Sequence, residues 1–341
     1  MDLSRESLKR AAIEQGFVLV GFARLRQLDE REAFYRQWLA EGGHATMAYL
    51  AREPERRFDP RLLDARYKSV VSLGYPYAAR ATPKVDWRGE LRGRIAAYAL
   101  GRDYHDVVLR RARAVAGVIS QLRPCSITRA YVDTGPVLER EWAADARIGW
   151  FGKNTMLLNR DHGSYFFLAE IFTDAEFEAT TGPYREHCGT CRRCLELCPT
   201  GALADGYVMR SDLCISYQTI ENRGAIPREM RSKLGNWIFG CDICNDVCPW
   251  NGEHASAAGS DDLLPYLPGL LALNDDEFGR RFTVSAVKRA KRRGLLRNVA
   301  VVLGNTQNPA AVAPLARALQ TENEPLIRSH AAWALGQIGG S

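Results

Sequence analysis

Residues 188–199 read CGTCRRCLELCP, and residues 241–249 read CDICNDVCP. The first stretch spaces its cysteines as C-x2-C-x2-C-x3-C followed by proline, which is the spacing of bacterial proteins that bind two [4Fe–4S] clusters. In those proteins the first three thiolates bind one cluster and the fourth binds the other. The two stretches therefore predict a ferredoxin-like module with two [4Fe–4S] clusters.

The second stretch repeats the end of the first but lacks one cysteine, which Cys214 can supply. The crossed arrangement then predicts two sets of four ligands. Cluster 1 takes Cys188, Cys191, Cys194 and Cys248, and cluster 2 takes Cys198, Cys214, Cys241 and Cys244. Structural zinc is the alternative, because paired C-x2-C turns also bind zinc. The C-x2-C-x2-C-x3-C-P run favours the iron–sulfur clusters.

The ninth cysteine, Cys125, follows Pro124 ahead of a predicted strand, and we expect it to be a small buried residue. The other eight lie between residues 188 and 248. In a reducing compartment such a concentration indicates metal binding rather than disulfides.

The sequence on either side of this module predicts two further parts. Residues 1–180 predict an α/β (α+β) domain, because apolar strand-like runs at 17–22, 69–75, 126–133 and 164–172 alternate with helical segments such as 103–122. The module, at 181–258, is placed in the manner of an insertion before a helical domain at 259–341. In that last domain an A-x-x-L-G pattern at 300–304 recurs at 332–336, around an apolar helix at 310–319. This period is typical of HEAT-like repeats.

Composition excludes several classes of protein. The chain is 46% hydrophobic and 25% charged, which excludes a disordered or collagen-like chain. It contains no apolar run long enough to span a membrane, and its first thirty residues lack the apolar segment of a secretory signal, so we expect a cytoplasmic protein without membrane contact. The net charge of +6 permits a nucleic-acid partner but does not demonstrate one.

Asp133 is the main candidate for catalysis. It ends a predicted strand and precedes Thr134-Gly135-Pro136, which predicts a sharp turn and a helix that starts at the proline. A carboxylate at the end of a strand can face a ligand crevice, although a turn-forming aspartate is the plainer interpretation. Tyr104 and His105 are further possible proton donors. Lys153-Asn154 lies in a glycine-flanked loop that could approach a large ligand, or could be a plain turn.

The chain resembles the epoxyqueuosine reductases of tRNA modification over nearly its whole length. The resemblance rests on several long motifs in order: ERRFDP at 55–60, YALGRDYHDVV at 98–108, YVDTGPVLEREWA at 131–143, GWFGKNTMLL at 149–158, CGTCRRCLELCPTGAL at 188–203, LCISYQTIENRG at 213–224 and FGCDICNDVCPWN at 239–251. It implies a cobalamin-binding α/β domain, a two-cluster ferredoxin module and a HEAT-like domain. The implied substrate is tRNA that carries epoxyqueuosine at the wobble position.

The resemblance also implies roles for single residues. Asp133 would be the proton donor, kept protonated because burial under the corrin raises its pKa. The implied cobalamin contacts are Arg56, Tyr98, Asp133, Leu157, Ser216 and Gln218. Asp103-x-His105-x-x-Val108 departs from the D-x-H-x-x-G motif of proteins that place a histidine on cobalt. We therefore expect base-off cobalamin without a histidine ligand.

The basic run at 288–297 contains no acidic residue and predicts a surface that contacts tRNA phosphates. Its members are Lys288, Arg289, Lys291, Arg292, Arg293 and Arg297. The alternative is a solvated helix face. We expect a monomer that receives electrons from an unidentified low-potential donor.

Two other functions compete with this one. A reductive dehalogenase also couples cobalamin to two clusters, but it usually carries a twin-arginine signal and lacks helical repeats. An electron-transfer adaptor would use the first domain only to bind a redox partner, and it would lack corrin absorption.

Overall fold

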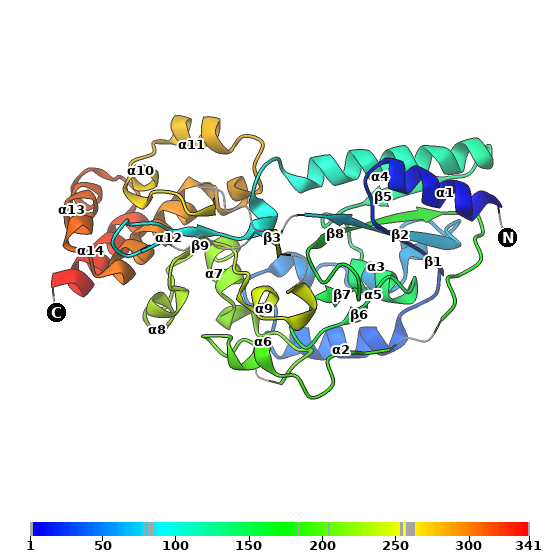
Figure 1. Cartoon of the computed structure of the whole chain (residues 1–341), viewed down its shortest axis with the longest axis horizontal. Helices are drawn as coiled ribbons and strands as arrows, with labels where there is room; N and C mark the ends of the chain where they lie inside the picture. Colours follow the sequence, from blue (N-terminus) through cyan, green and yellow to red (C-terminus); the bar gives the residue numbers. More distant parts are fainter. Residues whose placement is uncertain are drawn as a thin grey trace.

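The computed structural model describes residues 3–77, 79–80, 85–182, 185–203, 205–252, 255–256 and 263–339. A sheet layered with helices forms one end of the molecule and a group of helices forms the other, with the cysteine-rich segment beside both (Figure 1). Within the described residues, no helix is long and apolar enough to cross a membrane.

The N-terminal part is built on a four-stranded sheet in the order β1-β2-β8-β5. These strands span Leu19–Arg24 (β1), Ser69–Pro76 (β2), Phe166–Thr173 (β8) and Thr128–Tyr131 (β5). Each overlaps one of the four predicted strand segments. All three pairings are antiparallel, so the expected mixed fold takes the α+β form.

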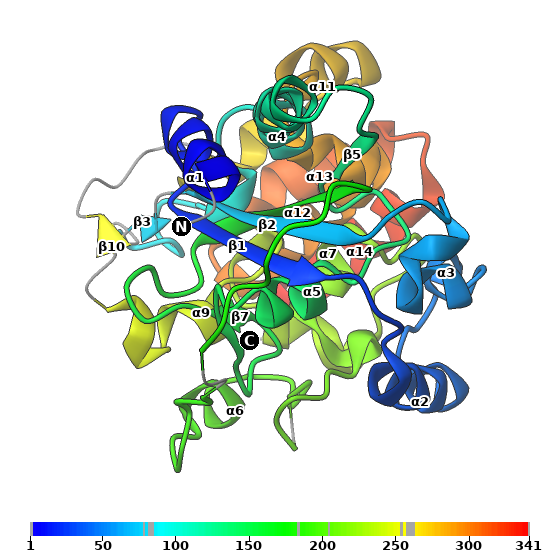
Figure 2. The same ribbon diagram turned by 90° about the vertical axis from the view of Figure 1, so that its right-hand side faces the viewer.

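Helices cover both faces of this sheet (Figure 2). On one face, Val71 and Leu73 of β2 pack with α1 (Leu3–Glu14) and α4 (Tyr104–Leu122). On the other face, Val70 packs with the fully buried Trp142 of α5 (Glu139–Asp145). Because neighbouring residues of a strand point to opposite faces, this alternation produces a three-layer domain. The helices α2 (Asp29–Ala40) and α3 (Glu55–Phe58) lie on the α5 side.

The helix predicted at 103–122 is confirmed as α4. Asp103 is its N-cap, and its side chain accepts a hydrogen bond from the backbone N–H of His105. The buried face carries Val108, Ala112 and Val115, at the spacing expected for an amphipathic helix.

The prediction for Cys125 is wrong. This residue is exposed, with a φ of 72° in the turn between α4 and β5. A turn at the end of a long surface helix offers no core in which a small side chain can be buried.

Among the described residues between 185 and 252, the cysteine-rich segment contains four short α-helices and one strand: α6 (Arg193–Glu196), α7 (Ile215–Ile220), α8 (Arg228–Arg231), β9 (Trp237–Phe239) and α9 (Ile243–Asp246). Its second half has a core of its own, in which Ile226, Leu234 and Trp237 pack against Val301. Metal clusters are therefore not its only source of stability.

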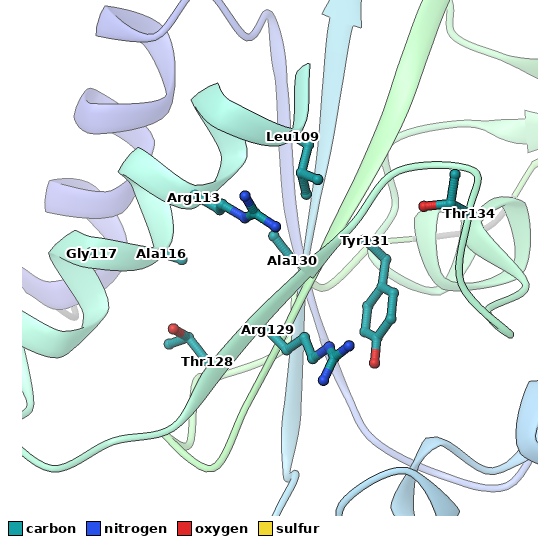
Figure 3. Close-up of a pocket in the computed structure, with 9 residues that line it drawn as sticks. All are labelled: Leu109, Arg113, Ala116, Gly117, Thr128, Arg129, Ala130, Tyr131 and Thr134. Atoms are coloured by element: carbon teal, nitrogen blue, oxygen red, sulfur yellow. The ribbon is translucent and has the colours of Figure 1, made fainter. Parts of the chain in front are cut away.

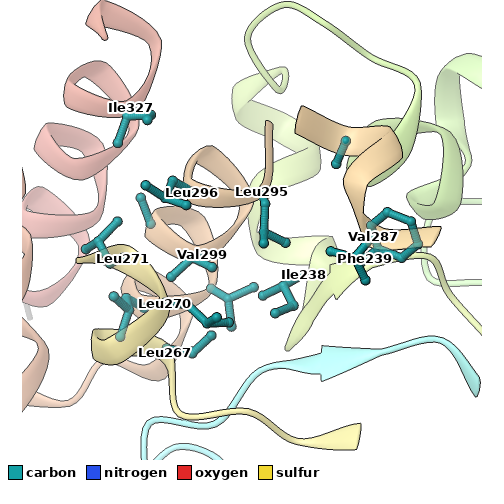
Figure 4. Packing of buried hydrophobic residues seen from close by; sticks show 14 of the residues in the cluster. Ile238, Phe239, Leu267, Leu270, Leu271, Val287, Leu295, Leu296, Val299 and Ile327 are labelled. Atoms are coloured by element: carbon teal, nitrogen blue, oxygen red, sulfur yellow. The ribbon is translucent and has the colours of Figure 1, made fainter. Parts of the chain in front are cut away.

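The C-terminal part consists of α10 (Leu267–Leu271), α11 (Asp275–Phe282), α12 (Lys291–Thr306), α13 (Val312–Thr321) and α14 (Pro325–Gly339). The two A-x-x-L-G motifs lie on α12 and α14, which pack together. A Cβ on Gly304 would lie 2.8 Å from Cα of Ala334, so the close contact between these helices requires glycine. Figure 4 shows Leu295 and Val299 of α12 in the core that joins α12, α10 and β9.

One segment of the N-terminal part belongs to this C-terminal core. β4 (Arg94–Ile95) pairs with β9 in parallel, and Leu91, Ile95 and Ala99 are buried among the C-terminal helices. The division at 180 and 258 thus remains a proposal, and residues 91–99 pack outside the domain to which it assigns them. Two further pairs are β6 (Trp150–Phe151) with β7 (Leu157–Leu158) and β3 (Ala79–Arg80) with β10 (Ala255–Ser256).

Candidate active site

The loop between β5 and α5 presents Asp133. Its φ of 56° is left-handed, a conformation that aspartate tolerates better than most residues and that is often found at functional sites. A Cβ on Gly135 would lie 2.2 Å from the Tyr131 ring, so the turn must contain glycine there. The helix begins at Glu139 rather than at Pro136 as expected. Because the sheet is antiparallel, Asp133 does not lie in a crevice at the carboxyl edge of a parallel sheet.

Hydrogen bonds connect Asp133 to the start of α4. Its Oδ2 accepts from the Tyr104 hydroxyl at 2.5 Å and lies 3.3 Å from Nε2 of His105. Nδ1 of His105 lies 2.7 Å from Oδ1 of Asp103. Lys288 Nζ in turn lies 3.0 Å from Oδ2 of Asp103. The three predicted proton-donor candidates therefore meet at one place.

Charge is unevenly distributed in this cluster. The surrounding protein withdraws water from Asp133 and by itself would raise its pKa, but the hydrogen bonds from His105 and Tyr104 hold the pKa below its ordinary value. The Asp133 side chain is 59% exposed, so we give the hydrogen bonds more weight than burial. Burial would lower the pKa of His105, but the bonds to Asp133 and Asp103 raise it. The hydrogen bonds therefore favour an ionised Asp133 beside a protonated His105, and the expectation of a protonated Asp133 under a corrin stays a prediction.

Aromatic rings form one wall of the site. Tyr104 stacks on Phe167, with centroids 4.3 Å apart, and on His105 at 4.0 Å. Tyr98, one of the expected cofactor contacts, meets Tyr104 edge to face at 6.0 Å. Burial, and then the charge of Asp133, raises the pKa of Tyr98. Tyr98 thus lies close enough to Asp133 to sense its charge.

The other expected cofactor contacts do not join this cluster. Arg56 pairs with Glu53 at 3.0 Å. Leu157 is buried in an apolar group with Ile148. Gln218, 3% exposed, donates to the Asp212 carbonyl at 2.6 Å. Ser216 lies on α7, beside Cys214.

The neighbours of two clustered thiols agree with the crossed arrangement, whose ligand sets stay a prediction. Burial, followed by the neighbouring thiols Cys248, Cys188 and Cys191, raises the pKa of Cys194. Burial, with Cys214 and Cys198 among the contributing neighbours, raises the pKa of Cys241. Cys248 is therefore close to the first three cysteines, whereas Cys198 is close to the second set.

This donor set suits iron–sulfur clusters. All eight cysteines are free thiols, and thiolates are the ligands of [4Fe–4S] clusters. Backbone N–H groups, such as those of Ile243 and Trp250, point at the sulfurs of Cys241 and Cys248, as is usual for cluster ligands. No three His, Cys, Asp or Glu side chains among the described residues lie close enough to hold a single metal ion. We therefore base the assignment on cysteine spacing and on which thiols are neighbours.

The loop with Lys153 and Asn154 holds the cysteine-rich segment in place. Lys153 Nζ donates to the carbonyls of Gly189 (2.6 Å) and Cys191 (3.1 Å), and Asn154 donates to that of Cys244 (3.3 Å). The loop therefore contacts ligand loops of both predicted clusters.

The basic run is paired with acids that the sequence places far from it. Arg289 bonds to Glu221 (2.8 Å), Arg292 to Glu322 (2.5 Å) and Arg293 to Glu324 (3.2 Å). Of the six residues, Lys288, Arg289, Lys291 and Arg293 are exposed and Arg292 is largely covered.

The prediction that Arg297 contacts tRNA is wrong. Arg297 is completely buried, and its guanidinium donates to the carbonyls of Gln218, Asn222 and Gly224. Burial lowers its pKa to about 9. A side chain enclosed in this way cannot reach a phosphate.

A cavity of about 460 Å³ lies between α4 and β5 (Figure 3). Arg113 and Arg129 line it, and so does Thr134, the residue that follows Asp133. Its lining contains neither Asp133 nor His105. We do not place the reaction there.

Three residues of the site escaped prediction. Asp103 was considered only as part of a failed cobalt motif, although it holds His105. Glu139 accepts the backbone N–H of Asp133 at 2.5 Å. Tyr49 lies under the Arg289 guanidinium, 5.8 Å from the ring centre, and senses the charge of Asp133. Glu139, six residues beyond Asp133, and Asp103, two residues before His105, left local signals that could have been followed.

Three family models match parts of the chain. Residues 57–134 match epoxyqueuosine reductase QueG, DUF1730; residues 187–251 match a 4Fe-4S double cluster binding domain; and residues 281–341 match HEAT repeats. The last two confirm the expected double-cluster and HEAT-like parts.

The relatives cited here that match nearly the whole chain are all named epoxyqueuosine reductase. An epoxyqueuosine reductase of Xanthomonas campestris is 39% identical over 97% of this chain and 95% of its own. A solved epoxyqueuosine reductase with an epoxyqueuosine-modified tRNA-Tyr stem loop superposes with a TM-score of 0.91 at 31% identity, covering 98% of this chain and 90% of the other. The structure of a Bacillus subtilis epoxyqueuosine reductase, with its aspartate catalytic loop swung out of the active site, superposes with a TM-score of 0.89 at 29% identity and with the same coverage.

Proposed function

The chain belongs to the epoxyqueuosine reductase family, and we propose on that basis that it reduces epoxyqueuosine at the wobble position of tRNA to queuosine. The observation that carries this proposal is the cluster of Asp133, Tyr104 and His105 beside a domain for two [4Fe–4S] clusters. Reduction of an epoxide to an alkene consumes two electrons and two protons and releases water. The domain for two [4Fe–4S] clusters would deliver the electrons, and the side chains of Asp133, Tyr104 and His105 would deliver the protons. The family match favours this function over a dehalogenase or an electron-transfer adaptor.

We propose cobalamin as the cofactor that joins the two sites. Both ring nitrogens of His105 are engaged, with Asp103 and Asp133, so this histidine is not available as a cobalt ligand. That fits base-off cobalamin without a histidine ligand. Tyr98 and the open face of Asp133 are the residues best placed to contact it, while Arg56, Leu157, Ser216 and Gln218 stay weaker proposals. When bound, cobalamin would supply a low-potential metal that passes electrons to the substrate.

The protein's own residues handle the proton. The Asp133 side chain is 59% exposed, so it can reach a bound epoxide oxygen, while Tyr104 and His105 orient its carboxylate. His105 holds a proton at Nε2 and can return it to Asp133 after transfer. Asp103 fixes the tautomer of His105 through Nδ1, and Lys288 balances the charge of Asp103. A positioned proton donor of this kind typically contributes ~10²–10⁴-fold to a rate.

We keep the crossed cluster ligands as part of the proposal: Cys188, Cys191, Cys194 and Cys248 for one cluster, and Cys198, Cys214, Cys241 and Cys244 for the other. Lys153 and Asn154, which hold ligand loops of both, support this arrangement.

For the tRNA we propose contacts with the exposed part of the basic run, Arg289, Lys291 and Arg293, with Lys288 at its active-site end. Arg292 contributes at most from its edge, because it is held by Glu322. We also propose that the protein is a cytoplasmic monomer and that a low-potential donor supplies its electrons.

The test is Asp133→Asn in single-turnover assays with chemically reduced holoenzyme and a modified stem loop. Asparagine tolerates the left-handed backbone at this position, so the variant should fold and bind both clusters, cobalamin and RNA. Reduction should fall by at least ~10²-fold, because the amide cannot deliver a carboxylic proton. Asp106→Asn, an exposed change on α4, is the control and should leave the rate unchanged. A near-normal rate in Asp133→Asn would contradict the assignment, and failure of the unaltered protein to reduce epoxyqueuosine would contradict the function.

A further inference from the structure

Asp133 has a second carboxyl group as a neighbour, which the reaction described so far does not use. Glu139 is the first residue of α5, and its Oε1 accepts the backbone N–H of Asp133 at 2.5 Å. The side chain is largely covered, because α5 packs against the sheet. The bond ties Glu139 to the same loop that presents Asp133.

The two carboxyl groups have opposite surroundings. The carboxylate of Asp133 receives hydrogen bonds from Tyr104 and His105, which favour its charged form. At the carboxyl group of Glu139 the structure gives a backbone amide as donor, and no ion pair to Glu139 is found among the described residues. A carboxyl group that is covered but not paired with a cation stays protonated more easily.

Five charged or titratable groups lie around Glu139. The charge of Asp133 on the loop opposes its ionisation, whereas the hydrogen bond from the Asp133 backbone N–H and the charges of Arg140 on α5 and His105 on α4 favour it. Burial, and then the charge of Asp133, outweighs these three and raises the pKa of Glu139 to about 8. Burial, and then the charge of Asp133, raises the pKa of Tyr104 on α4 far above its ordinary value, so Tyr104 stays neutral. On β8, Glu170 is completely buried and accepts from the Ser72 hydroxyl, and burial raises its pKa well above the ordinary value. Glu170 therefore stays neutral at working pH and offers no charge to Glu139.

This arrangement favours two exchangeable protons around one ionised aspartate: one on His105, whose pKa the bonds to Asp133 and Asp103 raise against the effect of burial, and one on Glu139, whose pKa burial raises. When carboxyl groups are shifted in opposite directions, the shifts indicate which is the acid. The proposed reaction consumes two protons at one oxygen atom: the first as the first carbon–oxygen bond breaks, and the second as the oxygen leaves as water. Two electrons enter, and the carbon–carbon double bond forms.

We propose that Glu139 is the second proton store of the reaction and passes its proton through Asp133 after His105 has supplied the first. This inference rests on the proposed function. Glu139 acts through Asp133 and does not touch the substrate, so it is a positioning and proton-supplying residue rather than a catalytic one.

The first experiment needs neither cofactor nor substrate. Infrared spectra of the protein as purified, taken from pH 6 to 10, follow the C=O band of protonated carboxyl groups. One group should lose its proton near pH 8. Burial raises the pKa of Asp242 to about 7, so Asp242 should change within the same range, and Glu139→Gln should abolish only the change near pH 8. Glu141→Gln is the matched control on the same helix, because Glu141 is paired with Arg31 and does not bond to the Asp133 loop. Persistence of the change near pH 8 in Glu139→Gln would overturn the proposal.

The second experiment measures single turnovers of reduced holoenzyme between pH 6 and 9. The unaltered rate should fall above about pH 8, as Glu139 loses its proton. Glu139→Gln keeps a carbonyl acceptor for the Asp133 N–H, so the loop should hold; its rate should be at least tenfold lower at pH 7 and should lack the fall near pH 8. Glu139→Asp, which keeps the acid, should regain part of the rate. An unchanged pH profile in Glu139→Gln would overturn the proposal, whereas absence of any reduction by the unaltered protein would overturn the proposed function instead.

Discussion

Arg297→Met separates a structural arginine from an RNA-binding one. The unaltered side chain makes five hydrogen bonds, to the carbonyls of Gln218, Asn222 and Gly224 and twice to Oδ1 of Asn298. Methionine fills a similar length of space but donates no hydrogen bond. The three backbone carbonyls would lose these donors inside the protein.

A buried acceptor left without a partner costs ~1–3 kcal/mol, so three carbonyls amount to about 3–9 kcal/mol. Part of this is offset, because the variant no longer buries a positive charge, whose cost is visible in the lowered pKa of Arg297. We expect a net local loss of about 2–4 kcal/mol. Since about 1.4 kcal/mol is tenfold in an equilibrium constant, amide exchange in α7 and α12 should accelerate by at least about 25-fold.

The faster amide exchange can be measured by hydrogen-exchange mass spectrometry. The affinity for tRNA is measured in parallel at several salt concentrations. Arg293→Met is the control: this residue is half exposed and its ion pair with Glu324 is worth little. It should leave exchange unchanged. If Arg297→Met left exchange unchanged but weakened tRNA binding and flattened its salt dependence, our placement of Arg297 in the core would be refuted.

Two further predictions follow from the clusters and the basic run. Cys198→Ser should perturb the cluster assigned to Cys214, Cys241 and Cys244 and leave the other near normal, as measured by iron content and electron paramagnetic resonance. Cys125→Ser is the control and should change neither cluster. Damage confined to the cluster of Cys188 would show that the ligands are not crossed. Replacing Lys291 and Arg293 by alanine should weaken tRNA binding and reduce the slope of log affinity against log salt by ~0.9 per lost phosphate contact. The control Arg280→Ala on α11 should change neither the affinity nor the slope. An unchanged affinity at low salt would exclude this surface as a tRNA contact.

Local patterns predicted much of the fold. The period of Val108, Ala112 and Val115 is enough to define α4, because a helix repeats its buried face every three or four residues. The strand segments were placed to within a few residues, but their antiparallel order was not, since pairing joins residues such as Val71 and Ile171 that lie far apart in sequence. The packing of Leu91, Ile95 and Ala99 against the C-terminal helices was not predicted for the same reason.

For the candidate site, too, some features could be predicted from the sequence and others required the tertiary structure. The sequence alone predicted the eight cysteine ligands of the two clusters and singled out Asp133 within its motif, because a spacing of two or three residues directly sets which side chains can share a small metal cluster or a turn. Only the tertiary structure decided that Asp103, His105 and Lys288 form one chain to Asp133, that Glu139 faces it, and that Arg297 is enclosed. Charge and burial depend on every element packed around a side chain, and a basic run without acids nearby in sequence can still meet Glu221, Glu322 and Glu324 in space.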